Sequence, residues 1–336
     1  AFDDVVATPF PVTSSESRFD LTFAFGEVND TLGLAIEYRT DLFDRASIER
    51  LARQCAVLLR AAVADPARPL AQLPMLAPDE VRQCVADAAG PPAPRALPML
   101  PACVEATVAE APGRVAVRSG DAVLTYAALD ARANAVAQAL HARGIGRGAV
   151  VAVACARSPC WIAALLGVWK VGAVYLPIDL SNPAARRAEM LGDSAARVVL
   201  ADHDADDALD IRTLDLCADG PSVLVTVTDP AYLIYTSGST GHPKGAMITH
   251  GALANMAAAQ SVDLSLSAGD RVAQFAAIGF DASLYELTLA WRAGAAITLV
   301  PETAKRDAAE FLTWLAAEQP SMLVLPPRSE EHTSEL

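Results

Sequence analysis

The chain has 336 residues, of which 53% are hydrophobic and 20% are charged, and its formal net charge is −14. This length has room for about two ordinary domains, and the apolar fraction excludes an intrinsically disordered chain. The negative balance argues against nucleic acid as the main partner, because a duplex-binding surface needs clustered Lys and Arg. The composition fits a soluble protein that holds anions locally with backbone amides and a few cations.

Cysteine usage and the apolar runs indicate a cytoplasmic protein without a membrane partner. Six cysteines are scattered without a CxxC pair, so metal-ligand spacing is absent and reduced, buried thiols are expected. The longest apolar run, Trp161 to Ile178, contains Lys170, Gly172 and Pro177, which predicts a buried helix followed by a buried strand. The chain opens on AFDDVV without Met or a signal-type segment, and we expect an internal fragment of a longer protein.

The first elements in the chain are a β-hairpin and a helix. Two β-prone runs, residues 19–28 and 32–38, are joined by an Asn-Asp pair, which is a hairpin signal. Apolar residues then recur at helical spacing from Ile48, after a candidate N-cap at Asp44 or Ser47. This part of the chain is predicted to be a small α+β unit.

A proline-rich stretch gives the clearest domain boundary. Five prolines occur in the eleven residues from Pro91 to Pro101, which is typical of a semi-rigid extended linker. We therefore expect one domain in residues 1–85, a linker in 86–101 and a second domain in 102–327.

Beyond the linker, apolar runs typical of buried strands alternate with helical patterns. The predicted strands are Val115–Arg118, Val150–Ala154, Ala173–Ile178, Arg197–Ala201, Tyr232–Tyr235, Arg271–Phe275, Ala296–Val300 and Met322–Leu325. The predicted helices are Tyr126–Arg143, Pro159–Lys170, Pro183–Gly192, Gly251–Ser261, Ala282–Arg292 and Asp307–Glu318. Such alternation predicts an α/β fold with mostly parallel sheets covered by helices.

The strongest chemical signal is the stretch AYLIYTSGSTGHPKGAMITHGAL, which is predicted to run strand, loop, helix. The helix is expected to start near Thr249 with its positive end towards the loop. The loop region combines hydroxyls, glycines and one lysine, namely Thr236, Ser237, Ser239, Thr240, Gly238, Gly241, Gly245 and Lys244. Hydroxyls and exposed amides suit phosphate oxygens, whereas the Walker spacing is not met. A strand-to-helix turn that binds nothing is the weaker alternative.

The string YTSGSTGHPKG, residues 235–245, resembles the signature of the adenylate-forming superfamily, which includes acyl-CoA synthetases and the adenylation domains of nonribosomal peptide synthetases. Three further segments follow the family's order and narrow the resemblance to the second group. They are LTYAALDARAN (124–134), WKVGAVYLPIDLSNPAARR (169–187) and FDASLYE (280–286). Together the resemblance covers about residues 101–327, so an adenylate-forming N-terminal domain is expected.

The resemblance implies an ATP-dependent reaction. The carboxylate of an amino acid attacks the α-phosphorus of Mg²⁺-bound ATP, giving aminoacyl-AMP and pyrophosphate, and the aminoacyl group then passes to the phosphopantetheine thiol of a separate downstream carrier domain. Such transfer depends mainly on positioning and charge neutralisation. By motif match, the phosphate-binding residues are Thr236, Ser237, Gly238, Ser239, Thr240, Gly241, Lys244 and Gly245.

Asp281 opens the segment that resembles the amino-acid pocket. A carboxylate at the mouth of an apolar cleft can pair with an α-ammonium group, which fatty and aryl acids lack. Asp281 could also N-cap a helix from Ala282, and the two roles are compatible. Ala282 and Tyr285 match two further pocket positions on one helical face, although Tyr285 also fits a plain core residue.

Two other polar residues receive structural interpretations. His250 follows Thr249 at the predicted helix start and is expected to be a first-turn structural histidine. Lys170 is expected to cap or leave the end of its helix. We predict no metal site from these residue types.

The first ninety residues resemble the C-terminal end of a condensation domain, through Phe19-Asp20-Leu21, the run EYRTDLF and the helix after it. The condensation family's HHxxxDG motif is absent, so this part is not expected to form peptide bonds. The implied partners are the amino-acid substrate, the upstream condensation domain and the downstream peptidyl carrier domain of the same synthetase.

The last residues also depart from the family. Past Pro327 the family would supply the rest of the pocket, a Mg²⁺-binding carboxylate, a ribose-binding Asp and a mobile subdomain, so no complete catalytic set and an inactive isolated chain are expected. The polar nonapeptide RSEEHTSEL, residues 328–336, resembles a translated sequencing adapter and is predicted to be a non-native tail, the alternative being a genuine polar loop. Two other functions stay open: a stand-alone carboxylate–CoA ligase and a non-catalytic docking piece.

Overall fold

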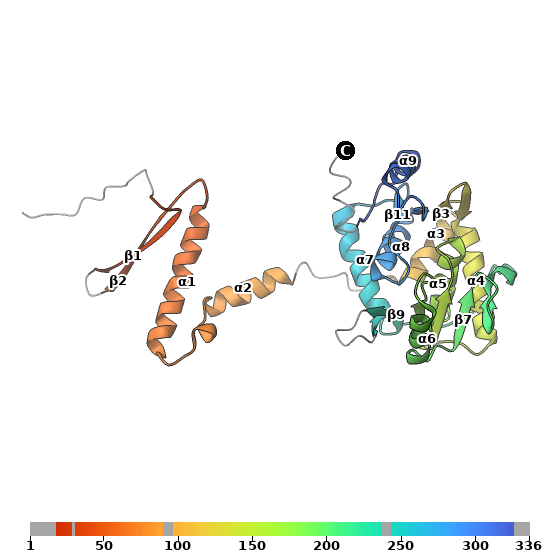
Figure 1. Ribbon diagram of the computed structural model, residues 1–336, viewed down its shortest axis with the longest axis horizontal. Helices are drawn as coiled ribbons and strands as arrows, with labels where there is room; N and C mark the ends of the chain where they lie inside the picture. Colours follow the sequence, from red (N-terminus) through yellow and green to blue (C-terminus); the bar gives the residue numbers. More distant parts are fainter. Residues whose placement is uncertain (1–17, 29–30, 90–96, 237–242, 326–336) are drawn as a thin grey trace, which may run out of the picture. The chain divides into compact units, whose positions relative to one another are not determined.

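The computed structural model describes residues 18–28, 31–89, 97–236 and 243–325, and the chain divides into two compact units, residues 1–92 and 93–336 (Figure 1). In the first unit, β1 (Leu21–Val28) pairs antiparallel with β2 (Thr31–Tyr38), which confirms the predicted hairpin, whose Asn-Asp turn lies outside the described residues. Helix α1 (Arg45–Ala64) begins after Asp44, whose carboxylate accepts a bond from the Ser47 amide at 2.8 Å.

A short 3₁₀ turn, η1 (Leu70–Gln72), and a second helix, α2 (Pro78–Ala88), complete the described part of this unit. Helix α2 was not predicted, and its last turn lies inside the stretch assigned to the linker. In the larger unit, α3 (Leu100–Glu110) likewise begins within that stretch. Its proline occupies the first turn, where the missing amide hydrogen would have no helical partner, so proline is compatible with helix there.

The larger unit contains two sheets and the helices that cover them. Its strands are β3 (Val115–Ser119), β4 (Ala122–Thr125), β5 (Val150–Ala154), β6 (Val174–Pro177), β7 (Val198–Ala201), β8 (Ala208–Asp210), β9 (Pro230–Thr236), β10 (Lys244–Thr249), β11 (Arg271–Gln274) and β12 (Ala296–Leu299). Its remaining helices are α4 (Tyr126–Ala142), α5 (Pro159–Lys170), α6 (Ala184–Asp193), η2 (Ile211–Thr213), α7 (His250–Leu264), α8 (Asp281–Ala293) and α9 (Ala308–Glu318).

The six-stranded sheet has the order β10-β9-β6-β5-β7-β8, and all its neighbours are parallel except the edge pair β10 and β9. The four-stranded sheet has the order β11-β12-β3-β4, with the β3–β4 hairpin as its antiparallel edge. The expected strand at Met322–Leu325 is a single bridge from Met322 to Val272, which corrects that prediction. The α/β class with mostly parallel sheets is confirmed.

Helix α5 lies at the centre of the core and contacts β5 and β6 of one sheet and β3 of the other. It follows a Ser158 cap with proline in its first turn, and every residue from Trp161 to Trp169 is buried. Helix α4 packs along it, as the ribbon shows (Figure 1). This continuous apolar helix explains the long apolar run in the sequence. In the described part of the chain, no helix combines the length and apolarity needed to cross a bilayer.

The cysteines differ in burial from the prediction. All six are free thiols, but only Cys155 is fully buried, and Cys84 is exposed.

Candidate functional site

The motif loop joins two strands of a hairpin rather than a strand and a helix. Strand β9 ends at Thr236 and β10 begins at Lys244, and the two pair antiparallel. The predicted helix does start after Thr249, which caps it through the Ala252 amide at 3.2 Å. Strand β10 therefore lies between the loop and α7, so the helix N-terminus is at the far end of the hairpin. The expected contribution of its dipole to the loop is wrong, because that effect falls off within about one turn.

Of the eight residues assigned to phosphate, three are described. Thr236 and Lys244 form the last pair of the hairpin register, and both are exposed; the Thr236 hydroxyl lies 3.4 Å from the Lys244 carbonyl oxygen. The other five, Ser237, Gly238, Ser239, Thr240 and Gly241, lie outside the described residues. The structure thus fixes where the loop leaves and rejoins the sheet.

Gly245 has a different role from the one expected. It lies in β10 opposite Tyr235, and a Cβ there would come within 2.8 Å of the Leu233 side chain. The glycine therefore permits close packing on β9 rather than a loop conformation.

A cavity of about 470 Å³ lies at the carboxyl ends of β6 and β9, beside this hairpin. Ligand sites of open α/β sheets occupy this position, and the volume is in the range of small-molecule sites. Its walls come from the β6–α6 region, the hairpin and the turn before α8, and comprise Pro177, Asp179, Asn182, Arg186, Met190, Tyr232, Ile234, Tyr235, Thr236, Ala246, Ile248, Gly279, Phe280 and Asp281. Thr236 and Asp281, which are 45 residues apart, thus line one cavity.

Asp281 is the first residue of α8 and does not cap it. The N-cap is Phe280, which makes no side-chain capping bond, so the capping interpretation is wrong. Asp281 is exposed rather than buried. Its negative charge, together with burial as the larger cause, raises the pKa of Tyr232, which lines the same cavity. The carboxylate is therefore available to a cationic ligand group.

Ala282 and Tyr285 are partly buried on the same helix. Neither is among the described residues that line the cavity with Asp281. Burial raises the pKa of Tyr285, so its hydroxyl stays protonated at neutral pH.

Arg186 is the cavity residue that the sequence reasoning overlooked. It extends from α6, and it is the cation among the described residues that line the cavity. No described acid is paired with it, and its buried Nε has no hydrogen-bond partner. The motif segment 169–187 contains this residue, so its position in that segment was the available signal.

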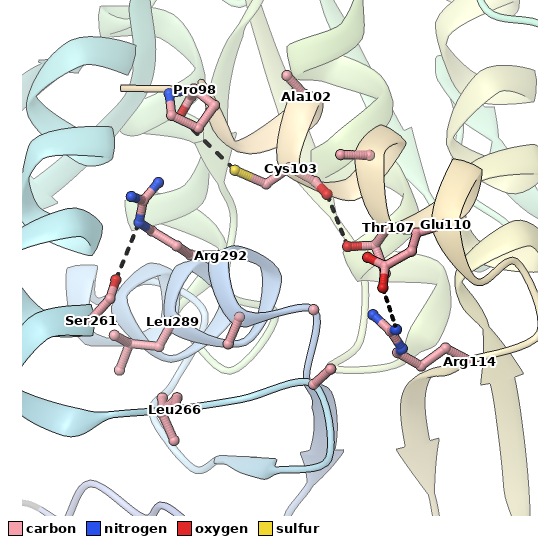
Figure 2. Close-up of a pocket in the computed structure, with 14 residues that line it drawn as sticks. Pro98, Ala102, Cys103, Thr107, Glu110, Arg114, Ser261, Leu266, Leu289 and Arg292 are labelled. Atoms are coloured by element: carbon pink, nitrogen blue, oxygen red, sulfur yellow. Dashed lines mark hydrogen bonds and ion pairs between the residues drawn. The ribbon is translucent and has the colours of Figure 1, made fainter. Parts of the chain in front are cut away.

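A second cavity, of about 490 Å³, lies on α3, α7 and α8 (Figure 2). Its polar side chains already have partners: Arg114 pairs with Glu110 at 3.3 Å, and Arg292 donates to the Ser261 hydroxyl at 3.2 Å. Burial raises the pKa of the Cys103 thiol, so it is not a thiolate at neutral pH. Among the described residues, this cavity offers no thiolate nucleophile, and none of the four motif segments contributes to its lining.

The described residues contain no group of three His, Cys, Asp or Glu side chains that could hold a metal ion.

Lys170, which was expected to cap or leave the end of its helix, has a defined structural role. Its ammonium group forms ion pairs with Glu105 and Asp130, both at 2.9 Å, and thereby ties α5 to α3 and α4.

Comparison with protein families identifies the class of protein to which this fold and cavity belong. Residues 104–331 match the model described as AMP-binding enzyme, so the chain belongs to that family. Residues 3–85 match the condensation domain model. A condensation-domain tail followed by an adenylation domain makes the chain part of a nonribosomal peptide synthetase.

Several curated relatives are synthetases of this kind. The chain is 39% identical over 329 residues to CymA of Salinispora arenicola, named a probable nonribosomal peptide synthetase, and 34% identical over 342 residues to chondramide synthase of Chondromyces crocatus. These matches cover 96% and 94% of this chain but only 4% and 9% of the two relatives. The isonitrile lipopeptide synthase of Mycobacterium tuberculosis is 34% identical over 345 residues, which are 96% of this chain and 14% of that protein.

Solved structures give the same fold. A four-domain nonribosomal peptide synthetase bound to AMP and glycine matches with a TM-score of 0.77 at 26% identity, over 92% of this chain and 24% of that one. The N-terminal subdomain of Klebsiella oxytoca NpsA, in complex with 3-hydroxyanthranilyl-AMSN, matches with a TM-score of 0.56 at 29% identity, over 61% of this chain and 54% of that one.

Proposed function

We propose that the cavity between Thr236 and Asp281 is where a synthetase containing this chain activates an amino acid as aminoacyl-AMP. The observation that carries the proposal is the shared cavity, because it joins the rim of a phosphate-loop motif to an exposed carboxylate. One wall thus suits an anionic substrate part and the other a cationic one. The relative named as a peptide synthetase, and the solved synthetase bound to AMP and glycine, support this interpretation.

ATP is the second substrate in this proposal. Its phosphates would be held by the loop from Thr236 to Lys244, where the hydroxyl and the ammonium group at the two ends of the loop are both exposed. The amino-acid carboxylate oxygen forms a bond to the α-phosphorus, the bond to the bridging oxygen breaks, and pyrophosphate leaves. Lys244 would neutralise charge on the leaving group and the Thr236 hydroxyl would donate a hydrogen bond to it. Positioning and stabilisation of charge are the main contribution a protein makes to such a transfer.

Mg²⁺ would enter with the nucleotide. Such ions keep several waters and need only one or two protein carboxylates besides the phosphates, which is compatible with described residues that hold no three-acid group. We assign no residue to it. The inactivity expected of the isolated chain remains a prediction, and the activity is proposed for the whole synthetase.

Asp281 is proposed to bind the α-ammonium group of the substrate. Its exposed carboxylate faces a cavity whose other charged lining residues, among those described, are Arg186 and Asp179, and the Asp179 carboxylate already accepts bonds from the amide and hydroxyl of Ser181. Ala282 and Tyr285 stay proposals as pocket residues. The upstream condensation domain and a downstream carrier domain bearing phosphopantetheine are the proposed partners within the synthetase.

ATP–pyrophosphate exchange by the synthetase, with a panel of amino acids and of fatty and aryl acids, tests the proposal. We expect exchange with at least one amino acid and none with the other acids, whereas a carboxylate–CoA ligase would show the reverse. Lys244→Ala should lower exchange for every substrate, and Arg306→Ala, an exposed cation outside the cavity, should not. A purely docking role predicts no exchange with any acid.

A further inference from the structure

A buried carboxylate lies under the segment that leads to Asp281. Glu286, on α8, is only 1% exposed. One of its oxygens accepts bonds from the backbone amides of Phe275 and Ala276 at 3.1 and 3.2 Å. The other accepts from the Gln274 side-chain amide at 3.0 Å and from the Ala276 amide at 3.2 Å. Through Glu286, helix α8 thus binds the start of the segment 275–280, and this segment leads into Asp281, the first residue of α8.

Gln274 extends this network to a different part of the fold. It is the fully buried last residue of β11, and its Nε2 also donates to the Ala276 carbonyl at 2.7 Å. Its Oε1 accepts from Nη1 of Arg157 at 3.1 Å, and its backbone carbonyl accepts from the same nitrogen at 2.7 Å. Arg157 lies just after β5 in the other sheet.

The same arginine is held at its other end. Its Nη2 forms an ion pair with Glu302 at 2.7 Å and a hydrogen bond with the Val300 carbonyl, just after β12. A continuous polar chain therefore runs from Glu302 through Arg157 and Gln274 to Glu286. It crosses the carboxyl ends of β12, β5 and β11, which is the edge where α/β folds bind ligands.

Residues 275–280, whose start is held by this series of hydrogen bonds, form one wall of the cavity. The last two residues of this segment, Gly279 and Phe280, line the cavity together with Asp281. The Glu286 carboxylate binds the start of the segment, and its end leads directly into α8, the helix that carries Glu286. A shift of the carboxylate would therefore move the wall and Asp281 together.

Stability alone gives little reason for a carboxylate at this position. Burial raises the pKa of Glu286 to about 7 against the lowering effects of its amide donors and of Lys305, which shows that the anion is costly there. Well-packed apolar residues often replace buried ionic groups without loss of stability. What an apolar residue could not supply is acceptors for the amide groups of Gln274, Phe275 and Ala276.

We propose that Glu286 is a positioning residue for the amino-acid substrate, which fixes the turn of residues 275–280 and through it the location of Asp281. This inference rests on the proposed function, because it names the residue that aligns the same cavity. Gln274 acts with Glu286 as the donor that orients the carboxylate, and Arg157 holds Gln274.

The test replaces the Glu286 carboxylate in the synthetase. Glu286→Gln puts an amide NH₂ where one carboxylate oxygen accepts from Gln274 and Ala276, so donors oppose each other there. We expect Glu286→Gln to raise the KM for the amino acid by about tenfold or more, since misplacement by about 1 Å can cost a hundredfold, with the KM for ATP changed less than about twofold.

Tyr126→Phe is the matched control for lost stability, because it removes a buried hydrogen bond of 2.8 Å to the Ala295 carbonyl away from the cavity. It should lower the melting temperature and leave both KM values unchanged. If Glu286→Gln behaves like this control, or raises both KM values equally, the positioning role is refuted. If Glu286→Gln does not fold, Glu286→Asp should show the same selective rise to a smaller degree, and its absence would also refute the role. Failure of the proposed function would appear separately, as a wild-type synthetase without amino-acid-dependent exchange.

Discussion

His250 is a buried residue whose ionisation should influence stability. It is the first residue of α7, is 1% exposed, and packs edge-on against Trp169 with ring centroids 5.6 Å apart. Neither ring nitrogen has a hydrogen-bond partner among the described residues. Burial lowers the pKa of His250 from 6.5 to about 4, and Asp229 opposes this only partly. The histidine is therefore structural, as expected, and stays neutral in the folded protein at pH 7.

Acid should destabilise the protein through this residue. The pKa of His250 is lower in the folded protein than in the unfolded chain. The contribution of the neutral imidazole to the free energy of unfolding is therefore fully present above about pH 6.5 and is lost as pH falls through about 4. The loss should be about 3 kcal/mol. We expect His250→Leu to remove this component from the difference in unfolding free energy between pH 7 and pH 4, measured by urea titration. An identical pH dependence for both proteins would show that the histidine is not the titrating group.

At the scale of elements, the contact between α4 and α5 explains a glycine in a buried helix. A Cβ on Gly167 would lie 2.7 Å from the Ala133 carbonyl oxygen and 2.7 Å from the Val136 Cβ, both on α4. Atoms of a packed helix backbone cannot move aside cheaply. The glycine therefore sets how closely the two central helices approach.

Gly167→Ala should accordingly destabilise the protein by about 1–3 kcal/mol, the usual cost of overpacking. Gly192→Ala is the matched control, because it also replaces a helical glycine but its Cβ would meet nothing within 4 Å. That variant should be neutral or more stable by up to about 1 kcal/mol, from helix propensity. Urea unfolding measures both, and equal effects of the two changes would contradict the close-packing account.

The elements that the sequence predicted well are the buried ones. Helix α5 matches its prediction over Pro159–Lys170, because Ser158, proline and a continuous apolar run mark it locally. Strand β10 was missed because it follows a glycine-containing loop and is largely exposed, so it lacks the apolar run of a central strand. The edge strands β4 and β8 were also missed, because they have only four and three residues and none of these is fully buried. Helices α2 and α3 were hidden by the prolines at their starts.

For the whole molecule, local motifs predicted which residues matter but not how they meet. The four motif segments led to the family and to Thr236, Lys244 and Asp281, and two of these three line one cavity. The polar chain below it could not be predicted, because Arg157 and Gln274 are 117 residues apart and meet only through the two sheets. The capping interpretation of Asp281 failed because α8 begins one residue earlier than expected.

The central claim is that the cavity activates the carboxylate of an amino acid whose ammonium group pairs with Asp281. The most direct measurement compares Asp281→Asn with wild type in pyrophosphate exchange, using the preferred amino acid and its des-amino analogue. Loss of one partner of a charge pair at a binding site predicts a decrease of about tenfold or more for the amino acid and a much smaller one for the analogue. Asp179→Asn, which removes a charge from the same cavity, should not reproduce this selectivity. Equal losses for both substrates, or the same selectivity from Asp179→Asn, would contradict the account.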